Sequence, residues 1–161
     1  MNSKYEINTK ENREFLKASC EDLLNFGHRF PSPNGGSYYL GDDGTPWKDR
    51  NRETWITCRM AHVYSLGLML GHEGSGELAD AALKGLRGEL HDEKNGGWYA
   101  GVTPEGDIVP NKQCYAHAFV ILAASSALTA GRPGAKELLE EALAVYDRHF
   151  WNEEEGLACD T

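Results

Sequence analysis

The sequence predicts an all-α protein built from repeated helix pairs. Apolar residues recur at three- and four-residue spacing in five segments, as in helices that bury one face. Glycines follow the second and fourth segments, at Gly71 and Gly131, where a left-handed helix end favours a residue without Cβ. The five predicted helices are Thr9–Phe26, Glu53–Leu70, Ser75–Leu90, Gln113–Ala130 and Gly134–Phe150.

The chain resembles itself after a shift of about sixty residues. The two copies share ten identical residues, and two of the shared pairs are the glycines that punctuate the helices. A period of this length fits a helical hairpin with a long connecting loop. The identical pairs are Ser65 and Ser125, Leu68 and Leu128, Gly71 and Gly131, Gly74 and Gly134, Glu77 and Glu137, Leu78 and Leu138, Ala82 and Ala142, Leu83 and Leu143, Glu93 and Glu153, and Gly96 and Gly156.

One such hairpin cannot bury its apolar face alone, so neighbouring hairpins must stack as an open solenoid or a closed ring. The segments Tyr38–Trp47 and Gly96–Asp107 favour the ring, because they combine aromatic residues with the turn pairs Asp43-Gly44 and Glu105-Gly106. We expect short hairpins there, at a rim where functional sites collect. Six units need roughly 360 residues. We therefore expect residues 1–161 to form a single N-terminal portion of a larger domain.

Composition argues against several classes of partner. A formal net charge of -9 without a basic cluster argues against a nucleic acid. The longest apolar stretch, Ala116–Ala124, is far shorter than a membrane span, and Met1–Asn12 does not resemble a secretory signal. The four cysteines form no C-x-x-C pair, which is typical of reduced thiols. The sequence therefore predicts a cytoplasmic protein with no membrane partner.

The candidate binding residues lie on two equivalent helices. Trp55, Arg59 and His62 share one helix face, and the sixty-residue shift places Trp55 on Tyr115. We therefore expect Trp55, Arg59 and Tyr115 to face one space, the funnel of a ring. An aromatic ring and a guanidinium there suit a sugar. The alternative is a structural Arg59 paired with an acid and a core Trp55, and His62 is more typical of a group that supports such a site from behind.

Gln113 and His117 lie four residues apart on the helix that bears Tyr115. Two ligands at this spacing can meet one metal ion. Gln is a poor ligand for transition metals, however, and no third ligand is apparent. We therefore expect no metal and no cofactor, and we expect Gln113 and His117 to support the site indirectly.

These residues belong to motifs of a known family. Residues 55–65, Trp-Ile-Thr-Cys-Arg-Met-Ala-His-Val-Tyr-Ser, resemble a helix of the N-acylglucosamine 2-epimerase family, in particular its mannose and sulfoquinovose isomerase branch. Residues 96–100, 112–117 and 150–155 resemble the next family segments in the same order. The resemblance covers nearly the whole chain from about Phe15 onward.

The resemblance implies an (α/α)6 toroid or barrel, of which this chain supplies roughly the first half. It implies an aldose–ketose isomerase or 2-epimerase that acts on a free monosaccharide such as mannose or sulfoquinovose, through a cis-enediol and without metal or cofactor. Arg59 and Tyr115 match substrate-binding positions of the family. Its proton-transfer histidines lie beyond the segment that matches Thr161. The catalytic residues are therefore unknown here, and we expect the chain to be inactive alone.

Two other functions stay open at this point. A glycoside hydrolase would need two carboxylates about 5–10 Å apart, for which Asp42, Asp43 and Asp92 are candidates in loops rich in turn residues. A non-catalytic helical-repeat fragment would bind a partner instead. An open half-ring would also associate with copies of itself through its exposed edges, so a homo-oligomer is possible.

Overall fold

The computed structural model describes residues 3–160, and it confirms the five predicted helices. A short 3-10 helix, η1 (Ser3–Tyr5), precedes them. Within the described residues, none of the helices has the length and apolarity needed to cross a bilayer. The helices are α1 (Lys10–Gly27), α2 (Thr54–Met69), α3 (Ser75–Leu86), α4 (Cys114–Thr129) and α5 (Ala135–His149).

The predicted helix ends differ from the observed ones by at most one residue, except at the end of the third helix. We expected the third helix to continue to Leu90, but α3 ends at Leu86 and the amide of Leu90 donates back to the Gly85 carbonyl. We also expected the last helix to begin at Gly134, but this glycine is the left-handed N-cap of α5, with φ 70°. The apolar pattern continues past the end of α3 because Leu90 is also buried.

Among residues 3–160, three small sheets lie in the loops between and after the helices. The predicted hairpins are confirmed, since β1 (Tyr39–Leu40) pairs antiparallel with β2 (Pro46–Trp47), and β4 (Gly101–Val102) pairs with β5 (Ile108–Val109). The strand β3 (Arg52–Glu53) pairs antiparallel with β4. The two residues just before α2 are therefore paired with the loop that follows α3. The last hairpin pairs β6 (Trp151–Asn152) with β7 (Leu157–Ala158).

The sixty-residue repeat is confirmed by the backbone. The helices α2 and α4 begin sixty residues apart, as do α3 and α5. Glycines at equivalent positions all adopt the left-handed conformation that other residues rarely adopt. Their φ angles are 82° and 68° for Gly71 and Gly131, 76° and 70° for Gly74 and Gly134, and 76° and 64° for Gly96 and Gly156.

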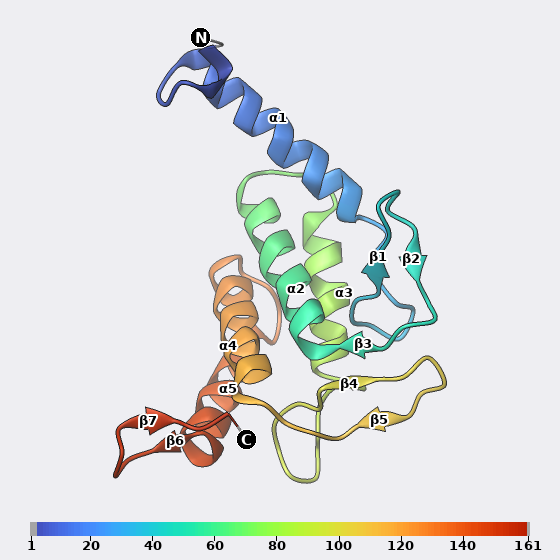
Figure 1. Ribbon diagram of the computed structural model, residues 1–161, viewed down its shortest axis with the longest axis vertical. Helices are drawn as coiled ribbons and strands as arrows, with labels where there is room; N and C mark the ends of the chain where they lie inside the picture. The colour runs from blue at the N-terminus through green and yellow to red at the C-terminus, as the bar shows by residue number, and fades with distance from the viewer. Residues whose placement is uncertain (1–2, 161) are drawn as a thin grey trace.

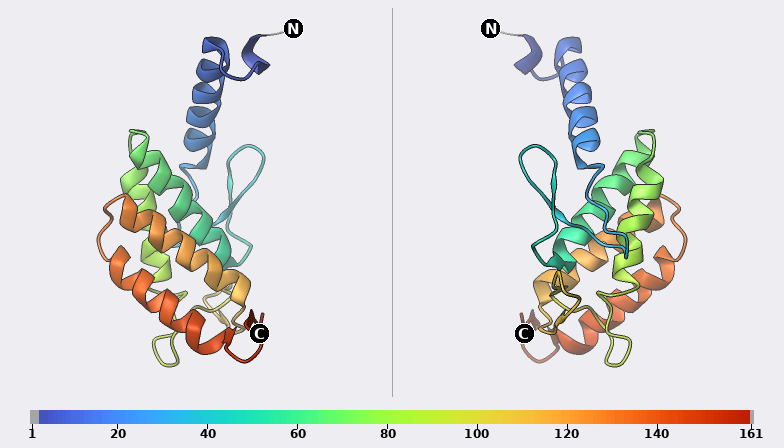
Figure 2. Two further views of the ribbon diagram at one scale, coloured as in Figure 1. Left: turned by 90° about the vertical axis from the view of Figure 1, so that its left-hand side faces the viewer. Right: turned by 90° about the vertical axis from the view of Figure 1, so that its right-hand side faces the viewer.

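The helix pairs pack side by side (Figures 1 and 2). The helix α2 packs against α3 and α4, and α4 packs against α5. Fully buried alanines, among them Ala61, Ala123 and Ala127, contribute small side chains to the core of these helices. The largest fully buried side chain is Trp98, whose indole N–H donates to the Leu86 carbonyl at 2.7 Å. The loop after α3 is thereby anchored in the core.

The helix α1 extends away from the other four (Figures 1 and 2). Thr9 caps it by accepting a hydrogen bond from the amide of Asn12 at 3.1 Å. Within α1, only Leu24 and Gly27 are buried. The hydroxyl of Tyr64 on α2 donates to the Leu24 carbonyl at 2.7 Å, which ties the end of α1 to the body.

We predict that Gly97→Ala destabilises the protein more than Gly106→Ala does. Both glycines have positive φ, which costs alanine about 1 kcal/mol or slightly more. A Cβ at Gly97 would also lie 2.8 Å from Nε2 of His117, whereas a Cβ at Gly106 would meet nothing within 4 Å. Overpacking should add about 1–3 kcal/mol at Gly97. Urea denaturation followed by circular dichroism measures the difference, and equal losses at the two sites would contradict the packing.

Candidate functional site

The structure brings Trp55, Arg59 and Tyr115 together, as the sequence predicted. The Arg59 guanidinium carbon lies 4.6 Å from the ring centroid of Trp55 and 4.8 Å from that of Phe119. Its Nη2 donates to the Tyr115 hydroxyl at 3.2 Å. The rings of Trp55 and Tyr115 are tilted toward each other, with centroids 6.3 Å apart. We name Trp55, Arg59, Tyr115 and Phe119 the Arg59 cluster.

The cluster lies at the beginnings of α2 and α4. The amide of Thr54 donates to the Ala100 carbonyl at 3.0 Å, and the amide of Cys114 donates to the Asp160 carbonyl at 2.9 Å. The two donors are sixty residues apart in the sequence, and so are the two acceptors. Each helix is therefore capped by the loop that follows the next helix along the chain. Trp55 and Tyr115 are the residues directly after the capped amides. The repeat therefore places both aromatic rings at the same end of the bundle.

A second group of side chains borders the cluster, and the sequence reasoning missed it. One carboxylate oxygen of Glu53 accepts the indole N–H of Trp55 at 2.9 Å and also accepts the Tyr39 hydroxyl. Tyr39, Arg50, Asn51 and Glu53 line an open cavity of about 320 Å³. The Arg50 guanidinium lies 4.4 Å from the Trp47 ring centroid. Two features of the sequence could have indicated this group. They are the aromatic residues of the hairpin before α2 and the position of Glu53 two residues before Trp55.

The side chains of the site present hydrogen-bond donors. Burial, together with the hydrogen bond to Glu53 and its charge, raises the pKa of Tyr39, so the phenol keeps its proton. Arg59 is exposed, and Tyr115 is 52% exposed. Two aromatic rings lie against the guanidinium and leave N–H groups at its edge. This arrangement can hold the oxygens of a polar ligand while its apolar faces contact the rings.

His62 lies between the two helices. Its Nδ1 is 2.7 Å from the Ser126 hydroxyl, and that hydroxyl donates to the Leu122 carbonyl at 2.8 Å. The half-buried ring therefore links α2 to α4 one turn below the Arg59 cluster. The supporting role that the sequence suggested for His62 stays a prediction.

His117 is completely buried, and its ring packs against those of Trp98 and Phe150. Its Nδ1 lies 2.8 Å from the Gln113 carbonyl oxygen, and its Nε2 accepts the amide of Trp98 at 3.1 Å. Burial lowers the pKa of His117, so the ring stays neutral. Both ring nitrogens are occupied, and the partner on Gln113 is the main chain rather than the side chain. Among residues 3–160, no group of three His, Cys, Asp or Glu side chains is arranged to hold a metal ion.

Two of the three loop carboxylates considered for a glycoside hydrolase, Asp92 and Asp43, are engaged in loop structure. Asp92 is buried, and its Oδ2 accepts the Lys112 ammonium at 2.6 Å. The hydrogen bonds from Lys112 and Asn95 hold the pKa of Asp92 well below its usual range. Asp43 accepts both the amide and the hydroxyl of Thr45, which lower its pKa. These contacts organise turns, so they do not favour a catalytic role.

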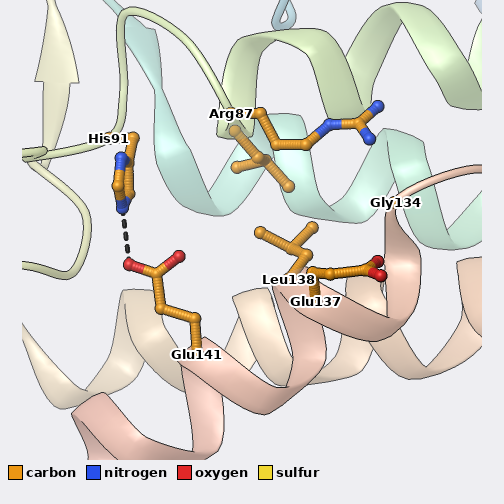
Figure 3. A pocket seen from close by; sticks show the side chains of 7 residues that line it. Arg87, His91, Gly134, Glu137, Leu138 and Glu141 are labelled. Atoms are coloured by element: carbon orange, nitrogen blue, oxygen red, sulfur yellow. Dashed lines mark hydrogen bonds and ion pairs between the residues drawn. The ribbon is translucent and has the colours of Figure 1, made fainter.

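Another cavity, of about 290 Å³, lies between the end of α3 and α5 (Figure 3). His91 Nε2 lies 2.6 Å from a Glu141 carboxylate oxygen, and Arg87 donates to the Pro133 carbonyl at 2.8 Å. These contacts join the segment after α3 to α5 and to the loop that precedes α5. None of the residues that line this cavity belongs to the Arg59 cluster.

Comparison with known proteins gives a consistent set of relatives. The model of the N-acylglucosamine 2-epimerase family matches residues 35–161. The chain is 41% identical over 145 residues to the D-mannose isomerase of Thermobifida fusca, covering 89% of this chain and 36% of that protein. A crystal structure of D-mannose isomerase superposes with a TM-score of 0.83 at 25% identity, covering 96% of this chain and 39% of that one.

The same fold occurs in an alpha-mannanase of Bacteroides thetaiotaomicron, with a TM-score of 0.74 at 15% identity, covering 94% of this chain and 42% of that one. This likeness shows the fold alone. The structural neighbours are (α/α)6 barrels, so the helix pairs of this chain form part of such a barrel, as the sequence predicted. The chain spans little more than a third of the length of the curated relative described above.

We predict that His117 contributes a pH dependence to stability. Its pKa in the folded protein is lower than the ordinary value of 6.5, so the unfolded chain takes up the proton first as the pH falls. The stabilisation is present above about pH 6.5 and is lost as the pH falls below it. His117→Asn should reduce the free energy of unfolding at neutral pH by about 1–3 kcal/mol and flatten its dependence on pH.

Urea denaturation between about pH 8 and pH 5 measures both effects. The control is Val102→Ala, because Val102 is buried in β4 and carries no titratable group, so a loss of stability there should leave the pH profile parallel to the wild type. If His117→Asn also ran parallel to the wild type, the buried neutral state of His117 would be contradicted.

Proposed function

Because the chain belongs to the N-acylglucosamine 2-epimerase family, we propose that its Arg59 cluster binds the substrate of an aldose–ketose isomerase. The proposed substrate is a free monosaccharide, with D-mannose as the first candidate. The curated relative at 41% identity is a D-mannose isomerase, which supports this choice. The proposed reaction moves a proton between C1 and C2 through a cis-enediol.

The observation that carries the proposal is the environment of Arg59. Among residues 3–160 it forms no ion pair with a carboxylate, and its neighbours are two aromatic rings and the Tyr115 hydroxyl. A guanidinium presents five N–H donors in a fixed plane, which suits the oxygens of an open-chain sugar. Trp55 and Tyr115 supply apolar surface for the carbon backbone of the sugar.

We propose that this chain holds the sugar and that the proton-transfer groups come from another part of the enzyme. Isomerisation needs a base within hydrogen-bond reach of the C1 or C2 proton and an acid near the carbonyl oxygen. His62 and His117 are occupied between helices and in the core. His72 lies 2.8 Å from the Ser75 hydroxyl, and His91 pairs with Glu141. The partial coverage of the relatives supports the same division of roles.

We predict that Arg59→Ala weakens D-mannose binding about 10- to 100-fold, because hydrogen bonds from a charged donor contribute roughly 1.5–3 kcal/mol. Titration of the isotope-labelled chain with D-mannose, followed by nuclear magnetic resonance, gives the dissociation constant. The control is Arg148→Ala, an exposed arginine on α5 that should leave the affinity unchanged. Equal affinities for the wild type and Arg59→Ala would remove Arg59 from the site.

We further predict that the 161-residue chain alone converts D-mannose to the ketose at a rate near background. Each missing general acid or general base lowers the rate about 10²–10⁴-fold. The assay follows ketose formation by nuclear magnetic resonance in the presence of a chelator, with D-mannose and sulfoquinovose as alternative substrates. Robust turnover by this chain would contradict the proposed division of roles, and turnover that the chelator abolishes would indicate a metal.

A further inference from the structure

We propose that Glu53 is a positioning residue for the sugar site, a proposal that rests on the proposed function. Its carboxylate holds the Trp55 indole in the orientation that places the ring against Arg59. The indole N–H of Trp55 donates to Oε2 of Glu53 at 2.9 Å, and the Tyr39 hydroxyl donates to the same oxygen. One carboxylate oxygen therefore fixes two aromatic side chains.

The backbone of Glu53 is itself held rigidly. Glu53 is the second residue of β3 and pairs with Gly101 of β4. A Cβ at Gly101 would lie 2.8 Å from the Arg52 carbonyl oxygen, so this close strand pairing needs glycine. The carboxylate therefore extends from a fixed point on a sheet, rather than from a free loop. Side chains anchored in this way orient their partners with little loss of conformational freedom on binding.

The side chain of Glu53 does not serve its own helix. Glu53 is the N-cap of α2, a position where a side-chain acceptor commonly bonds the first amides, yet it forms no such bond. The Thr54 amide is capped by the Ala100 carbonyl instead. The carboxylate is thereby available to Trp55 and Tyr39. Because the pKa of Tyr39 is raised, the phenol stays protonated as a donor to Glu53.

The positions of the three rings follow from these bonds. Tyr39 and Trp55 are arranged edge to face with centroids 6.2 Å apart, and Trp55 lies 4.6 Å from the Arg59 guanidinium carbon. Without an acceptor on Glu53, the half-buried indole N–H would have to turn toward water. The ring would then leave Arg59, and the guanidinium would lose one of the two rings that orient it.

The chain contains a matched control for this bond. The Trp151 indole N–H donates to Oε2 of Glu153 at 2.7 Å, again between residues two apart in sequence. Among residues 3–160, no hydrogen bond or ring contact joins Trp151 or Glu153 to the Arg59 cluster, and Glu153 is exposed. Glu153→Ala therefore removes the same kind of hydrogen bond away from the proposed site.

The experiment records the tryptophan indole N–H resonances of the isotope-labelled chain and then titrates it with D-mannose. Trp55→Phe identifies the Trp55 signal, and Trp98, bonded to the Leu86 carbonyl, is the internal reference. In Glu53→Ala the Trp55 signal should move upfield and exchange faster with water, and the affinity for D-mannose should fall about tenfold. Glu53→Gln keeps an acceptor oxygen and should recover part of the affinity. Glu153→Ala should move only the Trp151 signal and leave the affinity unchanged.

The outcomes separate this proposal from the proposed function. An unchanged Trp55 signal in Glu53→Ala, or a changed signal with the wild-type affinity, overturns the positioning role alone. The same loss of affinity in Glu153→Ala would also overturn it, since the effect would then be general. If the wild-type chain shows no response to D-mannose, the proposed function fails, and the role of Glu53 in it fails too.

Discussion

The Arg59 cluster depends on two backbone hydrogen bonds at the beginnings of α2 and α4. The first amides of a helix have no partner within the helix, so something outside must accept them. Here the Ala100 carbonyl accepts the amide of Thr54, and the Asp160 carbonyl accepts that of Cys114. Both acceptors lie in the loop that follows the next helix. Because Trp55 and Tyr115 come directly after these amides, the loops fix where both rings lie.

Much of this arrangement was predictable from the sequence because glycine marks the repeat. Gly71, Gly74 and Gly96 each recur sixty residues later, and all six adopt left-handed backbone. A positive φ favours glycine whatever the residue contacts, so it can be recognised from the sequence alone. The shift that aligns the glycines also aligns Trp55 with Tyr115, which is why their meeting could be predicted. The end of α3 could not be, since the buried Leu90 continues the apolar pattern beyond the last helical residue.

The remaining parts of the site depend on contacts between segments that share no period. Tyr39 and Glu53 lie in different sheets, and only the folded chain brings the phenol to the carboxylate. The spacing of two residues also does not show whether their contact is made by a side chain or by the main chain. The four-residue step from Gln113 to His117 resembled a pair of ligands, but the partner of the imidazole is the Gln113 carbonyl. The contact of Phe119 with Arg59 likewise requires α2 and α4 to lie side by side.

The contacts of Arg59 explain how a charged side chain can be ordered and still bind a ligand. A structural arginine usually satisfies its donors with a carboxylate, which leaves little for a ligand. Arg59 instead has aromatic rings within 4.6 and 4.8 Å of its guanidinium carbon and gives one N–H to Tyr115. Contacts of the cation with ring faces use the π surface rather than the N–H groups. The charge also stays exposed, so it avoids the desolvation that an unpaired buried cation would suffer. The side chain is therefore oriented without a ligand, and most of its donors remain available to the oxygens of the proposed sugar substrate.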